Sequence, residues 1–189
     1  MIDPTHLESK FASALPYDRY VTTGKPDHQT AWNDIYERTS LTDAQRKLIE
    51  GFERDLCVLI VSGTWCGDCV QQCPLVARIA EASSRIDLRF LDRDEHMDLA
   101  QRLMINEGVR VPVAVFISEE WDFVSSFGDR SLTRYRALAA KKLGASCPLP
   151  GAPIPDDELA GTLQDWLDEF ERVQLLLRLS PKLRSKHGD

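Results

Sequence analysis

The chain has 189 residues, of which 43% are hydrophobic and 28% charged, a composition typical of a globular protein with one sizeable core. Its net charge of −7 argues against nucleic acid as a main partner, because phosphate binding requires clustered lysines and arginines. No stretch approaches about 18 consecutive apolar residues, so we expect no membrane-spanning helix and no membrane partner.

The ends of the chain and its cysteines bear on the compartment. The first residues lack the basic and apolar segments of a secretory signal. The chain has five cysteines, an odd number, and Cys66, Cys69 and Cys73 lie close together. This clustering suits a reducing compartment better than a disulfide-stapled secreted domain, so the sequence predicts a cytoplasmic protein.

Residues 1–55 have helical spacing without strand alternation and are expected to form an N-terminal helical extension. Asp27 can cap one helix. Thr42 and Gln45 resemble a capping box that opens another.

Residues 56–144 are expected to form the central domain. The apolar run 56–61 is typical of a strand covered on both faces, and it precedes a helix over 67–83 that Pro74 should kink. The later expected elements, in chain order, are a strand at 86–91, a helix at 95–105, strands at 111–117 and 123–127, and a helix that Ser131 can cap and that runs to Leu143. This order predicts an α/β fold with a central mixed sheet and helices on both faces.

Residues 145–189 begin with a proline-rich linker and continue as an amphipathic helix over 156–179. The apolar stripe of this helix is expected to pack on its own domain, and a homodimer through the same helix is the alternative. We expect the tail, residues 182–189, to be disordered.

The segment Trp65-Cys66-Gly67-Asp68-Cys69 lies where the first strand passes into the helix. A Cys-x-x-Cys pair at such a junction is a redox signature. The helix N-terminus favours negative charge, so the pKa of Cys66 is expected to lie below that of a free cysteine. Asp68 should oppose the thiolate by like-charge repulsion.

Together with this motif, Val111-Pro112 and Gly128 resemble the thioredoxins over residues 55–143. The N-terminal extension and the Trp-Cys-Gly-Asp motif are further similar to a largely uncharacterised bacterial thioredoxin-like family. The resemblance implies a thioredoxin fold with helical extensions at both ends, and a cis Pro112 beside the cysteines.

The same resemblance implies roles for the site residues. Cys66 would attack a substrate disulfide and Cys69 would resolve the mixed disulfide. Substrate would contact Trp65, Gly67 and Asp68 and pair with the backbone of Val111 next to Pro112.

Some positions depart from the thioredoxin pattern. Ile60 stands where thioredoxins carry a buried aspartate that helps to deprotonate the second cysteine. Asp92 could substitute through water, although a solvated acid at a strand end is the simpler interpretation. Asp68 replaces a proline and Val113 replaces a threonine.

The remaining cysteines allow other interpretations. Cys73 is expected to be a buried core residue, with a third redox thiol or a metal ligand as alternatives. Cys57 is expected in the core and Cys147 at the surface. The four histidines form no pattern that would support a cysteine–histidine hydrolase.

The expected function is therefore thiol–disulfide exchange with protein or small-molecule disulfides, without a bound cofactor or metal. The sequence does not identify the electron donor. A binding module without turnover and a thiol-based metal carrier are the alternatives.

Overall fold

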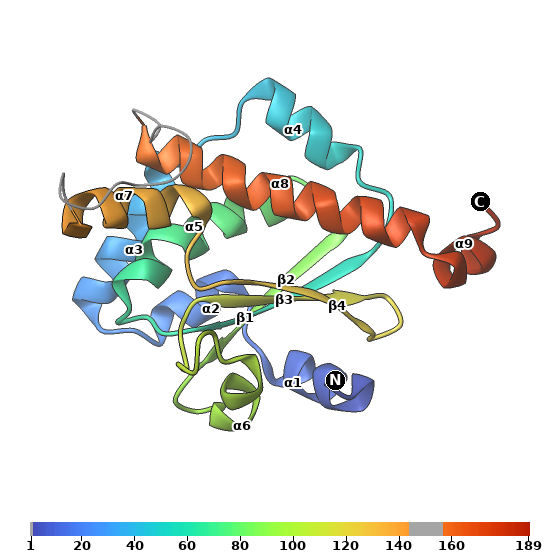
Figure 1. The fold of residues 1–189 in the computed structure, drawn as a ribbon, viewed down its shortest axis with the longest axis horizontal. Coiled ribbons are helices and arrows are strands. Elements are labelled where there is room, and N and C mark those ends of the chain that lie inside the picture. The colour runs from blue at the N-terminus through green and yellow to red at the C-terminus, as the bar shows by residue number, and fades with distance from the viewer. Residues whose placement is uncertain (1, 144–156) are drawn as a thin grey trace.

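The structure is a computed structural model that describes residues 2–143 and 157–189 (Figure 1). The strands are β1 (Leu56–Ser62), β2 (Ile86–Asp92), β3 (Val113–Ser118) and β4 (Phe123–Gly128). The helices are α1 (Pro4–Ser13), α2 (Tyr17–Thr22), α3 (Pro26–Arg38), α4 (Asp43–Glu50), α5 (Gly67–Glu81), α6 (Met97–Ala100), α7 (Leu132–Leu143), α8 (Glu158–Leu179) and α9 (Pro181–His187).

The four strands form one mixed sheet in the order β2-β1-β3-β4. Strand β1 runs parallel to β2 and antiparallel to β3, which is antiparallel to β4. The two central strands are apolar and almost wholly buried, because helices cover both of their faces. The mixed sheet expected from the order of elements is confirmed.

The helices lie in two layers. Helices α5 and α8 cover one face of the sheet, α7 packs against α8, and α1 and α6 lie against the other face (Figure 1). Helix α5 follows β1 directly, so its N-terminus lies at the end of a central strand. This is the thioredoxin arrangement that the sequence predicted, with additional helices at both ends.

The N-terminal extension joins the sheet through aromatic side chains and one backbone bridge. Tyr20 and Trp32 contact Phe90 of β2 at ring-centroid distances of 5.2 and 6.3 Å. Leu15 and Phe90 exchange two backbone hydrogen bonds, of 2.9 and 2.8 Å, at the outer edge of β2. The extension therefore shares the core of the domain.

The helix starts predicted for the N-terminal extension are only partly correct. The capping box of Thr42 and Gln45 is confirmed at the start of α4. The prediction that Asp27 caps a helix is wrong, because α3 begins one residue earlier at Pro26, with Lys25 at the cap position. Proline at the first helical position has no N–H to satisfy and a suitable φ.

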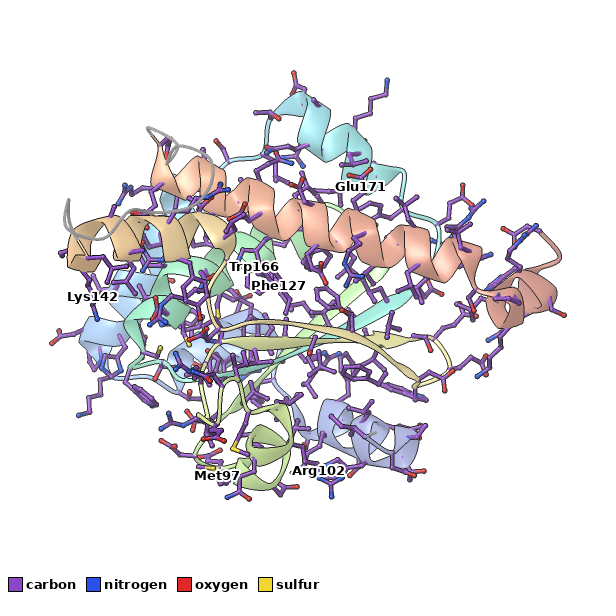
Figure 2. The ribbon with its side chains drawn as sticks, viewed as in Figure 1. Met97, Arg102, Phe127, Lys142, Trp166 and Glu171 are labelled. Atoms are coloured by element: carbon purple, nitrogen blue, oxygen red, sulfur yellow. The ribbon has the colours of Figure 1, made fainter. Side chains whose placement is uncertain are left out.

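Helix α8 packs its apolar stripe on the sheet, as expected. Trp166 meets Phe127 of β4 edge-on at 4.8 Å, between helix and sheet (Figure 2). Phe170 meets Phe116 of β3 in the same manner at 5.3 Å. The linker that precedes α8 and Cys147 lie outside the described residues.

Two expectations for the shorter elements are wrong. The tail is ordered as α9, because Ser180 caps it and Leu183 is buried in the core. The helix expected over 95–105 is only α6 followed by a 3-10 turn at Gln101–Leu103. The chain then turns through positive φ at Asn106 and Glu107, which ends helical geometry.

Candidate functional site

The two cysteines of the motif meet at the start of α5. Cys66 occupies the cap position and is partly exposed, whereas Cys69, inside the first turn, is fully buried. The two thiols share a hydrogen bond. Neither is in a disulfide, so the structure represents the dithiol form.

The second element of the site is the loop before β3 that contains Val111 and Pro112, here called the proline loop. The Val111–Pro112 peptide bond is cis, which confirms the expectation for Pro112. The Cys66 thiol donates a hydrogen bond to the carbonyl oxygen of Val111 at 3.6 Å. Cys66 and Val111, which are 45 positions apart in the sequence, are thus in contact through the Cys66 sulfur.

The electrostatics of the dithiol differ from the expectation. The hydrogen bond with Cys69, together with burial, raises the pKa of Cys66, while the backbone N–H groups of Cys69 and Asp68 act in the opposite direction. The predicted low pKa of Cys66 is therefore wrong for this state, because the neighbouring thiol and burial outweigh the helix terminus. Burial also raises the pKa of Cys69 well above its ordinary value.

The carboxylate of Asp68 is occupied by two arginines of the opposite segment. Arg130 lies 2.5 Å from one oxygen and Arg134 lies 3.1 Å from the other. The repulsion that Asp68 was expected to exert on Cys66 is offset by these two guanidinium groups. Asp68 instead ties the start of α5 to the start of α7.

Trp65 forms an exposed wall beside Cys66. Its side chain is 46% exposed, and the guanidinium of Arg93 stacks on the indole at 4.6 Å. A Cβ atom at Gly63 would lie 2.7 Å from the indole, so the ring needs a glycine behind it. Gly67, next to Cys66 on the other side, has open space around its Cα.

The end of β4 supports the proline loop from behind. A Cβ atom on Gly128 would lie 2.4 Å from the carbonyl oxygen of Pro112, and the φ of Gly128 is +157°. Only glycine fits such a close backbone approach. The next residue, Asp129, is buried and paired with Arg110 and Arg130.

The side chain of Gln72 connects α5 to the loop after β4 and to α8, a role that the sequence did not indicate. Its amide donates to the carbonyl of Asp129 at 3.0 Å, and its carbonyl accepts from the N–H of Ser131 at 3.0 Å. The indole N–H of Trp166 donates to the same oxygen at 3.3 Å. A glutamine inside a helix carries no sequence signal of this role, because all three partners come from distant segments.

Behind the exposed sulfur lies a buried row of polar groups. Cys73 is 1% exposed and lies 3.6 Å from the hydroxyl of Ser62, at the end of β1. Cys69 is hydrogen-bonded to both of them. Ile60 is an apolar core residue, as expected, so no carboxylate stands at its position.

Two further candidate residues lie outside this row, and Asp92 is the strand partner of Ser62. Cys57 is half-buried on β1, and burial raises its pKa to about 11. Asp92 is half-buried at the end of β2 and accepts from the N–H of Asp94 at 2.8 Å. Within 2–143 and 157–189, no three His, Cys, Asp or Glu side chains are placed to hold a metal ion.

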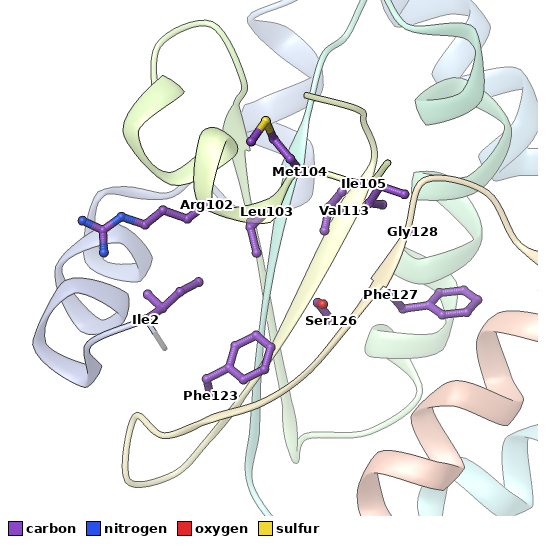
Figure 3. Close-up of a pocket in the computed structure, with 10 residues that line it drawn as sticks. All are labelled: Ile2, Arg102, Leu103, Met104, Ile105, Val113, Phe123, Ser126, Phe127 and Gly128. Atoms are coloured by element: carbon purple, nitrogen blue, oxygen red, sulfur yellow. The ribbon is translucent and has the colours of Figure 1, made fainter. Parts of the chain in front are cut away.

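A groove of about 900 Å³ lies on the face of the sheet that carries α6 (Figure 3). It starts at Val113 and Gly128, next to the proline loop, and continues along β4 to Phe123. The wall opposite β4 includes the apolar side chains of Leu103 and Met104 together with Arg102. Phe127 points away from the other labelled side chains, which matches its contact with α8.

The described helices include none with both the length and the hydropathy that crossing a bilayer requires.

Comparison with solved structures shows the fold. PA1234, a protein of unknown function from Pseudomonas aeruginosa, is 22% identical and has a TM-score of 0.68; the match covers 91% of this chain and 99% of that one. An HIV epitope scaffold is 18% identical with a TM-score of 0.62, covering 92% and 98% of the two chains. No functionally curated protein matches the chain.

The family comparison extends beyond the segment that carried the resemblance. The model of a thioredoxin family matches residues 14–141, more than half of the chain. This match includes α2, α3 and α4 of the N-terminal extension as well as the sheet and both cysteines. The chain therefore belongs to this thioredoxin family.

Proposed function

We propose that the protein is a thiol–disulfide oxidoreductase in which Cys66 is the nucleophile and Cys69 the resolving thiol. One observation carries the proposal. The partly exposed Cys66 thiol is hydrogen-bonded both to a buried partner thiol and to the Val111 carbonyl beside a cis proline. This arrangement gives one sulfur access to a substrate and keeps the other ready to displace it.

The reaction is a two-electron exchange. The Cys66 thiolate attacks a substrate disulfide, forming a mixed disulfide and releasing one substrate thiol. Cys69 then loses its proton and attacks the Cys66 sulfur, forming the Cys66–Cys69 disulfide and releasing the second substrate thiol. The substrate gains two electrons and two protons, and an external donor must reduce the protein again.

We infer that the protein works as a reductant. Oxidising dithiols owe their potential to a stabilised reduced form, in which a low pKa maintains a thiolate. Here the partner thiol and burial raise the pKa of Cys66, so the reduced form lacks that stabilisation. A reducing direction also agrees with the proposed cytoplasmic location.

The exposed surface around Cys66 supports protein disulfides as substrates. Trp65 provides an apolar wall next to the sulfur, and a groove of about 900 Å³ begins beyond the proline loop. An extended polypeptide can contact both and can pair with the backbone of Val111. A small disulfide would use only the immediate surroundings of Cys66.

The test is insulin reduction with dithiothreitol as donor. We expect activity in the unaltered protein, complete loss in Cys66→Ser, and accumulation of a mixed disulfide in Cys69→Ser. Cys57→Ser is the matched control, because Cys57 lies on β1 away from the pair. Equal activity in Cys66→Ser and Cys57→Ser would contradict the proposal.

A binding module without turnover is the second candidate, and the raised pKa of both thiols favours it. In that case the protein would bind partners at Trp65 and the proline loop without exchanging electrons. Inactivity in the insulin assay, with no mixed disulfide in Cys69→Ser, would select this candidate.

The homodimer through α8 remains a prediction. Leu175, Leu176 and Leu179 are 55%, 40% and 73% exposed, outside the buried stripe of the helix. Such a row can bury apolar area against a second copy. Sedimentation equilibrium of the unaltered protein and of Leu176→Lys checks it, and a monomer at all concentrations would exclude it.

A further inference from the structure

The resolving thiol lies in a closed polar environment to which three segments contribute. On α5, Cys69 is flanked by Cys66 and Cys73. From β1, the Ser62 hydroxyl lies 3.6 Å from the Cys73 sulfur and hydrogen-bonds Cys69, which lowers the pKa of Cys69 against the larger opposite effect of burial. Both sulfurs and the hydroxyl are at most 1% exposed. When Cys66 is held in the mixed disulfide, a proton leaving Cys69 therefore has no direct path to solvent.

The third contribution comes from the N-terminal extension. Tyr20 of α2 is 1% exposed, and its hydroxyl has no hydrogen-bond partner within the described residues. Burial raises the pKa of Tyr20, and the nearby Ser62 hydroxyl opposes that rise. Cys73, Asp92 and Cys69 also act on Tyr20 electrostatically. An unpaired buried hydroxyl costs free energy, so its position next to Ser62 calls for an explanation.

Tyr20 also lines a small pocket. The pocket has a volume of about 260 Å³ and lies between the extension and the end of β2. Tyr20, Thr64, Asp92 and His96 are among its lining residues. A water molecule needs only about 30 Å³ of liquid volume, so solvent can reach the ring of Tyr20 from this side.

We propose that Ser62 and Tyr20 form a proton relay that carries the proton of Cys69 to solvent in the pocket lined by Asp92. The inference rests on the proposed function, because the relay serves the attack of Cys69 on the mixed disulfide. It gives the N-terminal extension a part in the chemistry: α2 supplies the group that replaces a carboxylate at the position of Ile60.

The relay is balanced in protons and involves no redox change. Ser62 takes the proton of Cys69 while passing its own to the oxygen of Tyr20, and Tyr20 passes its proton to water in the pocket. Asp92, at the pocket wall, favours the cation formed there. The Cys69 thiolate is then free to attack the Cys66 sulfur.

The kinetic test separates the two thiols. In a background of Cys57→Ser and Cys147→Ser, the reduced protein is mixed with Ellman's disulfide. Attack by Cys66 releases one equivalent of coloured thiol, and attack by Cys69 on the resulting mixed disulfide releases the second. The rates of both steps are measured from pH 6 to about pH 10.

We expect Ser62→Ala and Tyr20→Phe to slow only the second release, by about 3- to 10-fold at pH 7, and to shift its pH midpoint upward. The rates should converge at high pH, where hydroxide replaces the relay. Asp92→Asn should have a smaller effect in the same direction. The matched control is Tyr17→Phe, since Tyr17 lies on the same helix and its hydroxyl is also unpaired. Tyr17→Phe should leave the pH midpoint unchanged.

The outcomes are distinct. An unchanged pH profile in Tyr20→Phe overturns the relay. An equal loss at every pH in Tyr20→Phe and Tyr17→Phe also overturns it, because that loss would reflect packing. If even the unaltered protein gives no second release, the proposed function fails, and titration of Cys69 by ¹³C NMR in Cys66→Ser decides on the relay separately. There, Tyr20→Phe must raise the pKa of Cys69 and Tyr17→Phe must not.

Discussion

The site has an outer half, formed by Trp65, Cys66, Val111 and Pro112, and an inner half, formed by Ser62, Cys69, Cys73 and Tyr20. In the outer half Trp65 and Cys66 are accessible to solvent, whereas Val111 and Pro112 are buried beside them, and these parts come from the two loops that flank the central strands. The inner half is buried and includes a side chain from the N-terminal extension. A thioredoxin sheet thus suffices for substrate access, whereas the surroundings of the resolving thiol depend on the added helices.

The largest expected effect concerns the backbone support of the outer half. Gly128→Ala places a Cβ atom 2.4 Å from the Pro112 carbonyl oxygen, which the packed backbone cannot accommodate. We expect a loss of about 2–5 kcal/mol in the free energy of unfolding. Urea denaturation measures it.

Gly67→Ala is the matched control for that substitution. A Cβ atom at Gly67 meets nothing within 4 Å, so we expect a change of less than about 0.5 kcal/mol. Equal losses in the two variants would show that the proline loop does not depend on the close approach of Gly128.

The next effect concerns Gln72, which joins the loop after β4 and helix α8 to α5. Gln72→Leu leaves the Asp129 carbonyl, the Ser131 N–H and the Trp166 N–H without this partner in a buried site. We expect a loss of about 2–4 kcal/mol by urea denaturation. Its neighbour Gln71 is partly exposed, so Gln71→Leu should cost less than about 1 kcal/mol.

The pH dependence of Cys66 alkylation tests whether the pKa of this thiol is raised. Because its pKa is raised, the thiolate is scarce at neutral pH and increases with pH. We expect the rate of Cys66 alkylation by iodoacetamide to rise about tenfold per unit between pH 7 and pH 8.5, without a plateau. A plateau below pH 8 would show that the helix terminus prevails over the Cys69 contact.

The smallest expected effect is that of Asp68→Asn. The carboxylate is already neutralised by Arg130 and Arg134, so its removal should change the alkylation rate of Cys66 by less than about twofold at pH 7. A several-fold increase in the rate would show that the charge of Asp68 acts directly on the Cys66 thiolate.

The sequence identified the outer half because its parts are local signals. A Cys-x-x-Cys pair at a strand–helix junction and a proline before a strand are each visible within a few residues. Even so, the pKa of Cys66 was predicted in the wrong direction. A helix terminus can be read from sequence, but the hydrogen bond to a buried partner thiol depends on how the first turn packs.

The inner half and the C-terminal tail were beyond sequence reasoning for a different reason. Tyr20 lies far upstream of Cys69, and no spacing rule connects them; only the packing of α2 against β2 does. The tail has polar spacing typical of disorder, yet Leu183 finds a place in the core and Glu119 pairs with Lys186 and His187. Such tertiary contacts determine whether a short segment with a weak helical signal is folded.

The bridge between Leu15 and Phe90 has a consequence for assembly. It uses the outward-facing N–H and C=O of Phe90, so an added strand cannot run along β2 without displacing the extension. On the opposite margin, no strand of the described residues pairs with β4. Association through edge strands would therefore stop at a dimer in which the β4 strands of two copies pair, and it could not propagate into a fibre.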